Sequence, residues 1–190
     1  MELQTLQPFS LVGGTALSLR YGHRSSVDLD LFYHIKFDHD QIEEELRSEF
    51  GGDFVYESGH KQFGIFCYIR KIKVDIVYFS HLPIAPIETE LGIRMYSSSD
   101  IAAMKIQAMP GRARKKDFWD LHEFFRHFSL QQIMDWHKQK YPSQMLAISI
   151  PNAITYFTDA EESETPVSLR DQTWPKIKKD ISKVVSDYLR

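Results

Sequence analysis

The sequence predicts an α+β fold in which a mixed sheet flanked by helices is followed by a helical region. In residues 1–98, short runs rich in β-branched and aromatic residues alternate with helical patterns. From residue 99 to residue 190, only helical periodicity is found. No repeat or low-complexity linker separates the two parts, so we expect a core at 1–98 and a helical region at 99–190 that pack together.

Turn-forming and capping residues set the boundaries of the elements in the first part. Gly22 is expected to end the first helix, because glycine readily adopts the left-handed conformation of a helix C-terminus. Asp38 stands at the capping position of the second helix. Val27, Leu29 and Leu31 are expected to pack into the core from one strand. In order, we expect a strand at 9–12, a helix at 15–21, a strand at 27–33, a helix ending near 51, an antiparallel meander of strands at 54–57, 63–69 and 73–79, and an edge strand at 93–96.

The second part is read as a series of helices. Pro110-Gly111 is expected to end the first of them, because proline removes a backbone donor. Ser129 is a capping residue, and Trp174-Pro175 begins a final amphipathic helix. The acidic residues 159–166 are expected to form a loop. The other helices are expected at 100–109, 115–127, 130–138 and 152–157.

The composition is that of a globular protein with a formal net charge of −3. This charge excludes a protein coated in basic residues, although a local positive patch is compatible with it. Cys67 is the only cysteine, so no internal disulfide can form, and a buried free thiol in the reducing cytoplasm is expected. We find neither a signal peptide nor an apolar run of the roughly 18 residues that a membrane helix needs, so we expect a soluble protein.

Two aspartates and a glycine-rich turn form the most informative pattern in the chain. Asp28 and Asp30 alternate with apolar residues, so on a strand their carboxylates share one face. Like charges this close repel each other unless a cation lies between them. Gly13-Gly14-Thr15, about one helix length upstream, opens a helix whose free N–H groups suit the phosphates of a nucleotide. The pattern indicates a metal ion and a triphosphate at one edge of the fold.

A third carboxylate, Asp75, lies within an apolar strand-like run. Alternation places Lys73 and Asp75 on one face of this strand, and Val74 and Ile76 on the other. Burying an unpaired carboxylate is costly, so Asp75 should meet a cation or accept hydrogen bonds. If its strand neighbours that of Asp28, the acids could hold two divalent ions about 3.5–4 Å apart, with Asp75 as a ligand or as the base that accepts a hydroxyl proton.

These segments resemble the AbiEii/AbiGii toxin family of nucleotidyltransferases, a branch of the DNA polymerase β-like superfamily. The resemblance rests on residues 11–17, 22–32 and 73–75 and continues more weakly over most of the chain. It implies a polymerase β-like core in which Gly14-Thr15 and the aspartate pair form the superfamily's motif. Thr15 departs from the usual serine but keeps the hydroxyl. Only eight residues precede the first expected strand, where relatives often carry helical sequence.

The resemblance also implies a function. It predicts transfer of a nucleotide from an NTP to an acceptor, with RNA such as tRNA as the expected acceptor, by the toxin of a type IV toxin–antitoxin or phage-defence system. The expected cofactors are two Mg²⁺ ions, with Mn²⁺ as the alternative, and a cognate antitoxin is an expected partner. The resemblance further assigns Lys105 to the triphosphate charge and places Lys116, Asp117 and Asp120 along the nucleotide cleft.

Several of these residues also have simpler interpretations. Arg24 could bind a phosphate with two nitrogens, or pair with a nearby acid. Lys73 could merely balance the charge of Asp75, and Lys105 could be a surface lysine. The basic residues Arg112, Arg114, Lys115 and Lys116 could contact RNA phosphates, or form a solvated charge run neutralised by Asp117 and Asp120.

The histidines show no pairing typical of zinc ligands, and we expect His122, His127 and His137 on helix surfaces. Two rival functions stay open. The same donor site could serve a small-molecule or protein acceptor, or the fold could bind nucleotides without turnover. The presence of Asp28, Asp30 and Asp75 together counts against the second rival.

Overall fold

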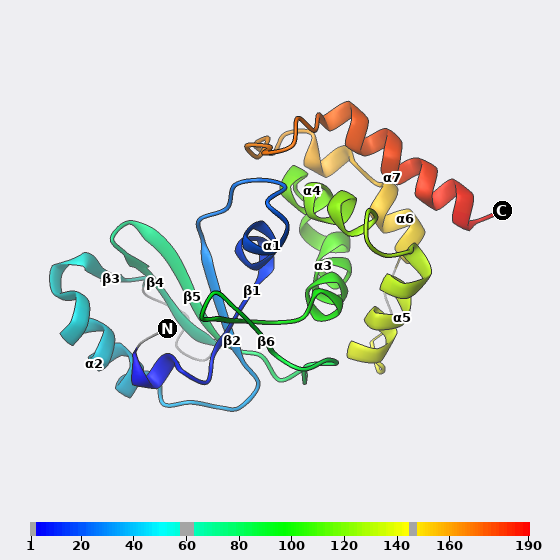
Figure 1. Ribbon diagram of the computed structural model, residues 1–190. Helices are drawn as coiled ribbons and strands as arrows, with labels where there is room; N and C mark the ends of the chain where they lie inside the picture. The colour runs from blue at the N-terminus through cyan, green and yellow to red at the C-terminus, as the bar shows by residue number, and fades with distance from the viewer. Residues whose placement is uncertain (1–2, 58–62, 145–147) are drawn as a thin grey trace.

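The structure is a computed structural model that describes residues 3–57, 63–144 and 148–190. Its seven-stranded mixed sheet has the order β3-β4-β5-β2-β1-β7-β6, and helices α3 to α7 gather to one side of it (Figure 1). The strands are β1 (Ser10–Val12), β2 (Leu29–Tyr33), β3 (Phe54–Tyr56), β4 (Gly64–Ile69), β5 (Ile72–Tyr78), β6 (Glu88–Glu90) and β7 (Ile93–Met95). The α-helices are α1 (Gly13–Tyr21), α2 (His39–Phe50), α3 (Ser98–Arg112), α4 (Lys115–Phe124), α5 (Leu130–Lys140), α6 (Ile150–Thr155) and α7 (Trp174–Tyr188).

The sheet combines antiparallel and parallel neighbours. Strands β3, β4 and β5 form the expected antiparallel meander. Strand β5 then lies parallel to β2, and β2 lies antiparallel to β1, which pairs in parallel with β7. Between β2 and β5, the chain forms α2, β3 and β4, and β5 then lies beside β2. This return brings residues that are distant in sequence onto neighbouring strands.

Local sequence signals explain most helix boundaries. Gly22 ends α1 with a φ of 58°, in the left-handed region that glycine tolerates. The Asp38 carboxylate accepts hydrogen bonds from the N–H groups of Asp40 and Gln41 at 3.0 and 3.2 Å and begins α2. Ser129 caps α5 in the same way. These ends agree with those expected from the sequence.

The strand expectations are wrong in two places. Strand β2 begins at Leu29, so Val27 lies in the preceding loop and is 69% exposed instead of buried. Strand β7 is not at the edge, because β6 pairs on its outer side through a hairpin. The hydrophobic pattern missed β6, whose sequence Glu-Thr-Glu has no apolar alternation.

Several helices also differ from their expected bounds, among them α5, which ends at Lys140, and α6, which spans Ile150–Thr155. Helix α3 runs through Pro110 to Arg112, because a proline near a helix C-terminus removes only one hydrogen bond and the buried Met109 still packs against the core. Helix α4 ends at Phe124 and not at residue 127. A short 3₁₀ helix, Thr158–Ala160, occupies the start of the expected acidic loop.

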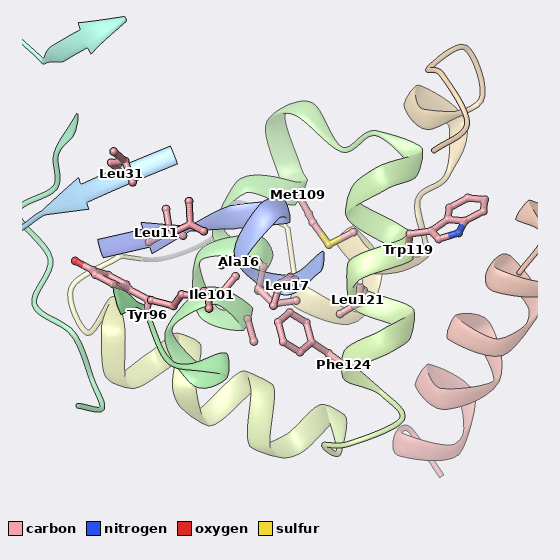
Figure 2. Close-up of a cluster of buried hydrophobic side chains, with 14 of the residues drawn as sticks. Leu11, Ala16, Leu17, Leu31, Tyr96, Ile101, Met109, Trp119, Leu121 and Phe124 are labelled. Carbon is pink, nitrogen blue, oxygen red and sulfur yellow. The ribbon is translucent and has the colours of Figure 1, made fainter. Parts of the chain in front are cut away.

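One hydrophobic core joins the sheet to the helical region. Figure 2 shows α1 side chains between those of the sheet and those of the later helices. Leu11 and Leu31 come from β1 and β2, Leu17 comes from α1, and Ile101 and Phe124 come from α3 and α4. Because this cluster spans the expected boundary at residue 98, the two regions pack together as expected, while the boundary itself stays a prediction.

Two buried histidines correct the expectation of surface positions. His122 is buried, with its Nε2 atom 2.9 Å from the Asp180 carboxylate. His137 is also buried and bonds to Gln107. Cys67 is a buried free thiol, and burial raises its pKa to about 12. No helix in the described part of the chain is long and apolar enough to cross a membrane.

A buried ion pair fastens the helical region to the loop that follows β5. The Asp100 carboxylate, at the start of α3, accepts hydrogen bonds from Lys140 Nζ at 2.6 Å, from Ser97 Oγ at 2.8 Å and from the N–H of Ile84 at 3.0 Å. The side chains of Asp100 and Lys140 are both 0% exposed. Removing either partner would leave the other as an uncompensated buried charge.

We expect Lys140→Met to lower the free energy of unfolding by about 3–5 kcal/mol, because it leaves the Asp100 carboxylate buried without its cation. Urea denaturation measures this change. Lys138→Met removes an exposed lysine of the same helix and should stay within about 0.5 kcal/mol of wild type. Equal stability of the two variants would contradict the role of the pair.

Candidate active site

The parallel pairing of β2 with β5 places two aspartates side by side. Asp30 is the register partner of Asp75, so their side chains extend from the same face of the sheet on neighbouring strands. The alternate residues Leu31 and Ile76 point to the other face and are buried in the core. This alternation agrees with the pattern that the sequence predicted for both strands.

The N-terminus of α1 lies against Asp30. Val12, the last residue of β1, pairs with Asp30, and Gly13 begins the helix directly afterwards. A Cβ atom at Gly13 would lie 2.6 Å from Asp30 Oδ2, and Gly13 has a φ of +69°. Glycine is therefore required here by both space and conformation. No side chain among the described residues caps this helix, so its first N–H groups are available to an anion.

Thr15 ties the first turn of α1 to the loop before β2. Its hydroxyl donates a hydrogen bond to the carbonyl oxygen of Asp28, and its Oγ1 atom lies 2.9 Å from Ser26 Oγ. The hydroxyl proton is thus already used within the protein. Contact of Thr15 with a phosphate stays a prediction, for which its backbone N–H is the better placed donor.

The acid pair is incompletely compensated by the protein. Burial and the neighbouring Asp75 raise the pKa of Asp30, and the charge of Asp28 adds to the rise, while Lys105 and Lys73 act against it. Asp75 Oδ2 accepts a hydrogen bond from Lys73 Nζ at 2.5 Å. Asp75 Oδ1 is buried and has no hydrogen-bond partner among the described residues. A buried oxygen without a partner is costly, so this atom is suited to a cation.

The expected gathering of three carboxylates is only partly present. Within the described residues, no group of three or more His, Cys, Asp or Glu side chains is arranged to hold a metal ion. The structure brings Asp30 and Asp75 together and places Asp28 just before β2, where its charge acts on both Asp30 and Lys73. The metal-ligand assignment of these acids stays a prediction.

A fully buried carboxylate, Asp120, connects α4 to the loop after α1 and to α3. Its Oδ1 atom accepts hydrogen bonds from Arg24 Nε at 2.6 Å and from His23 Nε2 at 2.8 Å. Its Oδ2 atom accepts from Arg24 Nη2 at 2.9 Å and pairs with Lys105 Nζ at 2.7 Å. Despite the penalty of burial, these partners hold the pKa of Asp120 far below its usual range.

Lys105 lies between two carboxylates and is not a surface lysine. Its ammonium contacts Asp120 and, at 2.7 Å, Asp117 Oδ1, and its side chain is 12% exposed. Burial lowers the pKa of Lys105, but these carboxylates outweigh that effect and raise it, so the ammonium stays charged. Desolvation also opposes ionisation of Asp117, but Lys105 and the N–H of Arg114 lower its pKa overall.

The structure distinguishes the alternatives considered for Arg24. Its guanidinium makes a two-nitrogen contact with Asp120, so the interpretation as a partner of an acid is the one observed. A Cβ atom at Gly14 would overlap Arg24 Nη2, so Gly14 permits the guanidinium to cross the start of α1. Asp120 is fully buried and so is not open to the cleft in which the resemblance placed it, and Arg24 is 2% exposed; direct contact with a nucleotide stays a prediction for both.

The basic stretch before α4 is used in part by the protein itself. Asp117 accepts a hydrogen bond from the N–H of Arg114 at 3.0 Å and supplies the anion that the helix N-terminus favours. Lys115 Nζ donates to backbone carbonyls of residues 161 and 163. Lys116 is partly exposed and has no ion pair within the described part of the chain, whereas the side chain of Arg112 lies outside the described residues.

Two features of the site were not anticipated from the sequence. His23 is fully buried against Asp120, and its proximity to Arg24 in sequence was the available signal. A C-terminal strap, residues 167–169, forms backbone hydrogen bonds with the loop at 23–25. The N–H of Ser25 donates to Val167 at 2.9 Å, and the N–H of Leu169 donates to His23 at 3.0 Å. Its sequence carries no strand pattern.

Solved structures of similar shape are nucleotidyltransferases. MenT4, a nucleotidyltransferase toxin from Mycobacterium tuberculosis, has a TM-score of 0.62 and 14% identity over 94% of this chain and 75% of its own. A candidate nucleotidyltransferase from Helicobacter pylori has a TM-score of 0.59 and 18% identity over 96% of this chain and 89% of its own. At these identities the likeness shows the fold, so this chain has a nucleotidyltransferase fold.

Sequence comparison identifies the family. The profile of the family described as "Nucleotidyl transferase AbiEii toxin, Type IV TA system" matches residues 3–188. An uncharacterized protein from Aquifex aeolicus is 32% identical over 195 residues, covering 100% of this chain and 92% of its own. The chain belongs to the AbiEii nucleotidyltransferase toxin family. The resemblance found in the sequence and the expected α+β nucleotidyltransferase fold are both confirmed.

We expect Asp120→Asn to lower the free energy of unfolding by about 3–5 kcal/mol at neutral pH, because Lys105 and Arg24 lose their shared buried anion. The pKa of Asp120 is depressed in the folded protein, so its stabilising contribution is present above the ordinary aspartate pKa and is lost as the pH falls. The difference in the free energy of unfolding between wild type and variant, measured by urea denaturation, should therefore become smaller at acidic pH. Glu162→Gln, at an exposed acid, should show no difference at either pH.

We expect Asp30→Asn to raise the melting temperature of the metal-free protein at pH 7 by about 2–4 °C, the effect of ~1 kcal/mol in a chain of this size. The pKa of Asp30 is raised in the folded protein. Between the ordinary aspartate pKa and this raised pKa, the folded protein binds more protons than the unfolded one, so its stability falls as the pH rises through this range. Thermal unfolding in EDTA tests this. A lower melting temperature of the variant at pH 7 would contradict the unfavourable burial of this charge.

Proposed function

We propose that this protein transfers a nucleotide from an NTP to an acceptor hydroxyl, and that the edge formed by α1, β2 and β5 is its catalytic site. The observation that carries this proposal is the position of Asp30 between two features. The uncapped N-terminus of α1 lies on one side of it, and Asp75 lies on the other. A phosphate-binding turn and an acid pair are thereby next to each other, as transfer of a nucleotide requires.

The donor triphosphate is expected at the start of α1. Gly13, Gly14 and Thr15 supply backbone N–H groups at the positive end of the helix dipole. Neither glycine can carry a side chain without meeting Asp30 or Arg24, so the absence of side chains lets these two residues lie against the start of α1. Lys116, partly exposed at the start of α4, is a basic residue that could contact phosphate charge.

The acid pair fits a divalent cation. Asp75 Oδ1 has no partner among the described residues, and Asp30 is destabilised in its charged form by burial and by Asp75. A cation shared by these oxygens would relieve both penalties. Mg²⁺ or Mn²⁺ bound there would lower the pKa of the acceptor hydroxyl and offset charge on the phosphates. The second ion expected from the sequence would also need the Asp28 carboxylate.

In the proposed reaction, the oxygen of the acceptor hydroxyl forms a bond to the α-phosphorus of the NTP. The bond from that phosphorus to the oxygen bridging to the β-phosphate breaks, and pyrophosphate leaves with that bonding pair. The hydroxyl proton passes to a carboxylate oxygen of the acid pair that does not hold the cation. Lys105 contributes positive charge near Asp30 while Asp117 and Asp120 hold it in place.

Family membership supports the biological part of the proposal. We propose RNA, such as tRNA, as the acceptor, a cognate antitoxin as the partner that restrains the enzyme, and the cytoplasm as the place of action. The profile describes a toxin of a type IV toxin–antitoxin system, and MenT4 is a nucleotidyltransferase toxin. The partly exposed Lys116, at the start of α4, is compatible with RNA phosphates.

The test supplies the purified chain with each α-labelled NTP in turn, MgCl₂ and total cellular RNA, and measures label on RNA and release of pyrophosphate. We expect Asp30→Asn and Asp75→Asn each to lower the transfer rate by about 10³-fold, the order found when a group that stabilises transition-state charge is removed. Asp53→Asn alters an exposed acid directly before the edge strand β3 and should retain the wild-type rate.

The alternatives give different outcomes in the same assay. Label on protein or on a small molecule instead of RNA would contradict RNA as the acceptor, but would agree with the proposed donor site. Full activity in folded Asp30→Asn and Asp75→Asn would overturn the site. Nucleotide binding without pyrophosphate release under any acceptor would indicate a binding module.

A further inference from the structure

The acid pair already has one cation, which is part of the protein. Lys73 Nζ contacts Asp75 Oδ2, and the contact leaves the other oxygen of Asp75 buried without a partner. Lys73 precedes Asp75 by two residues on β5, so both side chains lie on the face that carries Asp30. Its side chain is 37% exposed, so the ammonium can leave Asp75 without opening the core.

The other buried cations near the site are neutralised by their own acids. Lys105 and Arg24 are both bound to Asp120, and Lys105 is also bound to Asp117. These two cations and two anions form a closed, formally neutral cluster. Asp30 takes no part in it, and Asp75 takes its only ion pair within the described residues from Lys73.

A positive charge next to a cation site weakens the binding of any ion that enters. The repulsion between an ammonium and a divalent ion is strongest at a few ångströms, and the partial exposure of Lys73 to water reduces it. The same ammonium stabilises the carboxylates when no ion is present. Its two effects act in the same direction, because both favour the ion-free site.

We propose that Lys73 is a built-in counter-cation that occupies the acid pair in the absence of a metal ion and competes with that ion for Asp75. This inference rests on the proposed function, since it concerns the ion expected at the same carboxylates. It gives Lys73 a role beyond structure: the lysine keeps the affinity for the free ion low. An ion that arrives with the negative charge of a triphosphate then has the advantage, because the released ammonium gains an anion to pair with.

Direct binding of Mn²⁺ to the purified full chain, counted by the EPR signal of free Mn²⁺, tests the proposal without reference to activity. We expect Lys73→Met to bind Mn²⁺ about tenfold more tightly than wild type, because the variant lacks the ammonium that repels the ion. Lys73→Arg keeps the charge and should stay within about twofold of wild type. Lys71→Met removes an exposed charge on the preceding turn, and should also stay within about twofold.

Thermal unfolding supplies the second measurement. We expect Lys73→Met to melt at a lower temperature than wild type in EDTA, and to gain more than wild type from added Mn²⁺. Asp30→Asn is expected to abolish Mn²⁺ binding. If it does so while Lys73→Met binds Mn²⁺ no more tightly than wild type, the role of Lys73 is overturned and the metal site stays in place. Absence of Mn²⁺ binding in every variant, with or without a non-hydrolysable NTP, would overturn the metal site of the proposed function as well.

Discussion

The buried carboxylate of Asp120 is the interaction on which the arrangement of the site depends. A charged group with no access to water is tolerated only when its hydrogen-bonding capacity is filled, and Asp120 fills it with His23, Arg24 and Lys105. These partners come from the loop after α1 and from α3, while Asp120 itself lies on α4. The helical region therefore fixes the loop that leads to Asp28 and into β2, while the register with β1 and β5 positions Asp30.

This constraint separates two charge environments that are close in space. The cluster around Asp120 is closed and formally neutral, so it is a rigid support and offers little attraction to a ligand. The edge formed by Asp30 and Asp75 is acidic and only partly compensated, so it is the place where an added cation gains most. The protein thereby stabilises one group of charges and leaves the neighbouring group dependent on what binds there.

The sequence predicted correctly those features of the site that depend only on residues close together in the chain. The alternation around Asp30 and Asp75 set their common face, and Gly13 marked the turn against the acid, since these signals need only neighbouring residues. Sequence could not supply the parallel register of β2 with β5 or the partner of Asp120, because both depend on which distant segments meet. Strand β6 was not predicted because it is an edge strand that is held by backbone hydrogen bonds to β7, and its sequence has no apolar alternation.

The strap at residues 167–169 has a consequence for how the protein is made. The loop at 23–25 is synthesised more than 100 residues before its backbone partners at 167–169. Until that segment has been synthesised, Ser25 and His23 lack these bonds, and Asp120 must wait for α4 as well. A growing chain therefore contains Asp28, Asp30 and Asp75 before the residues that fix the loop at 23–25 have been synthesised, so this loop reaches its final conformation only after all three aspartates have been made.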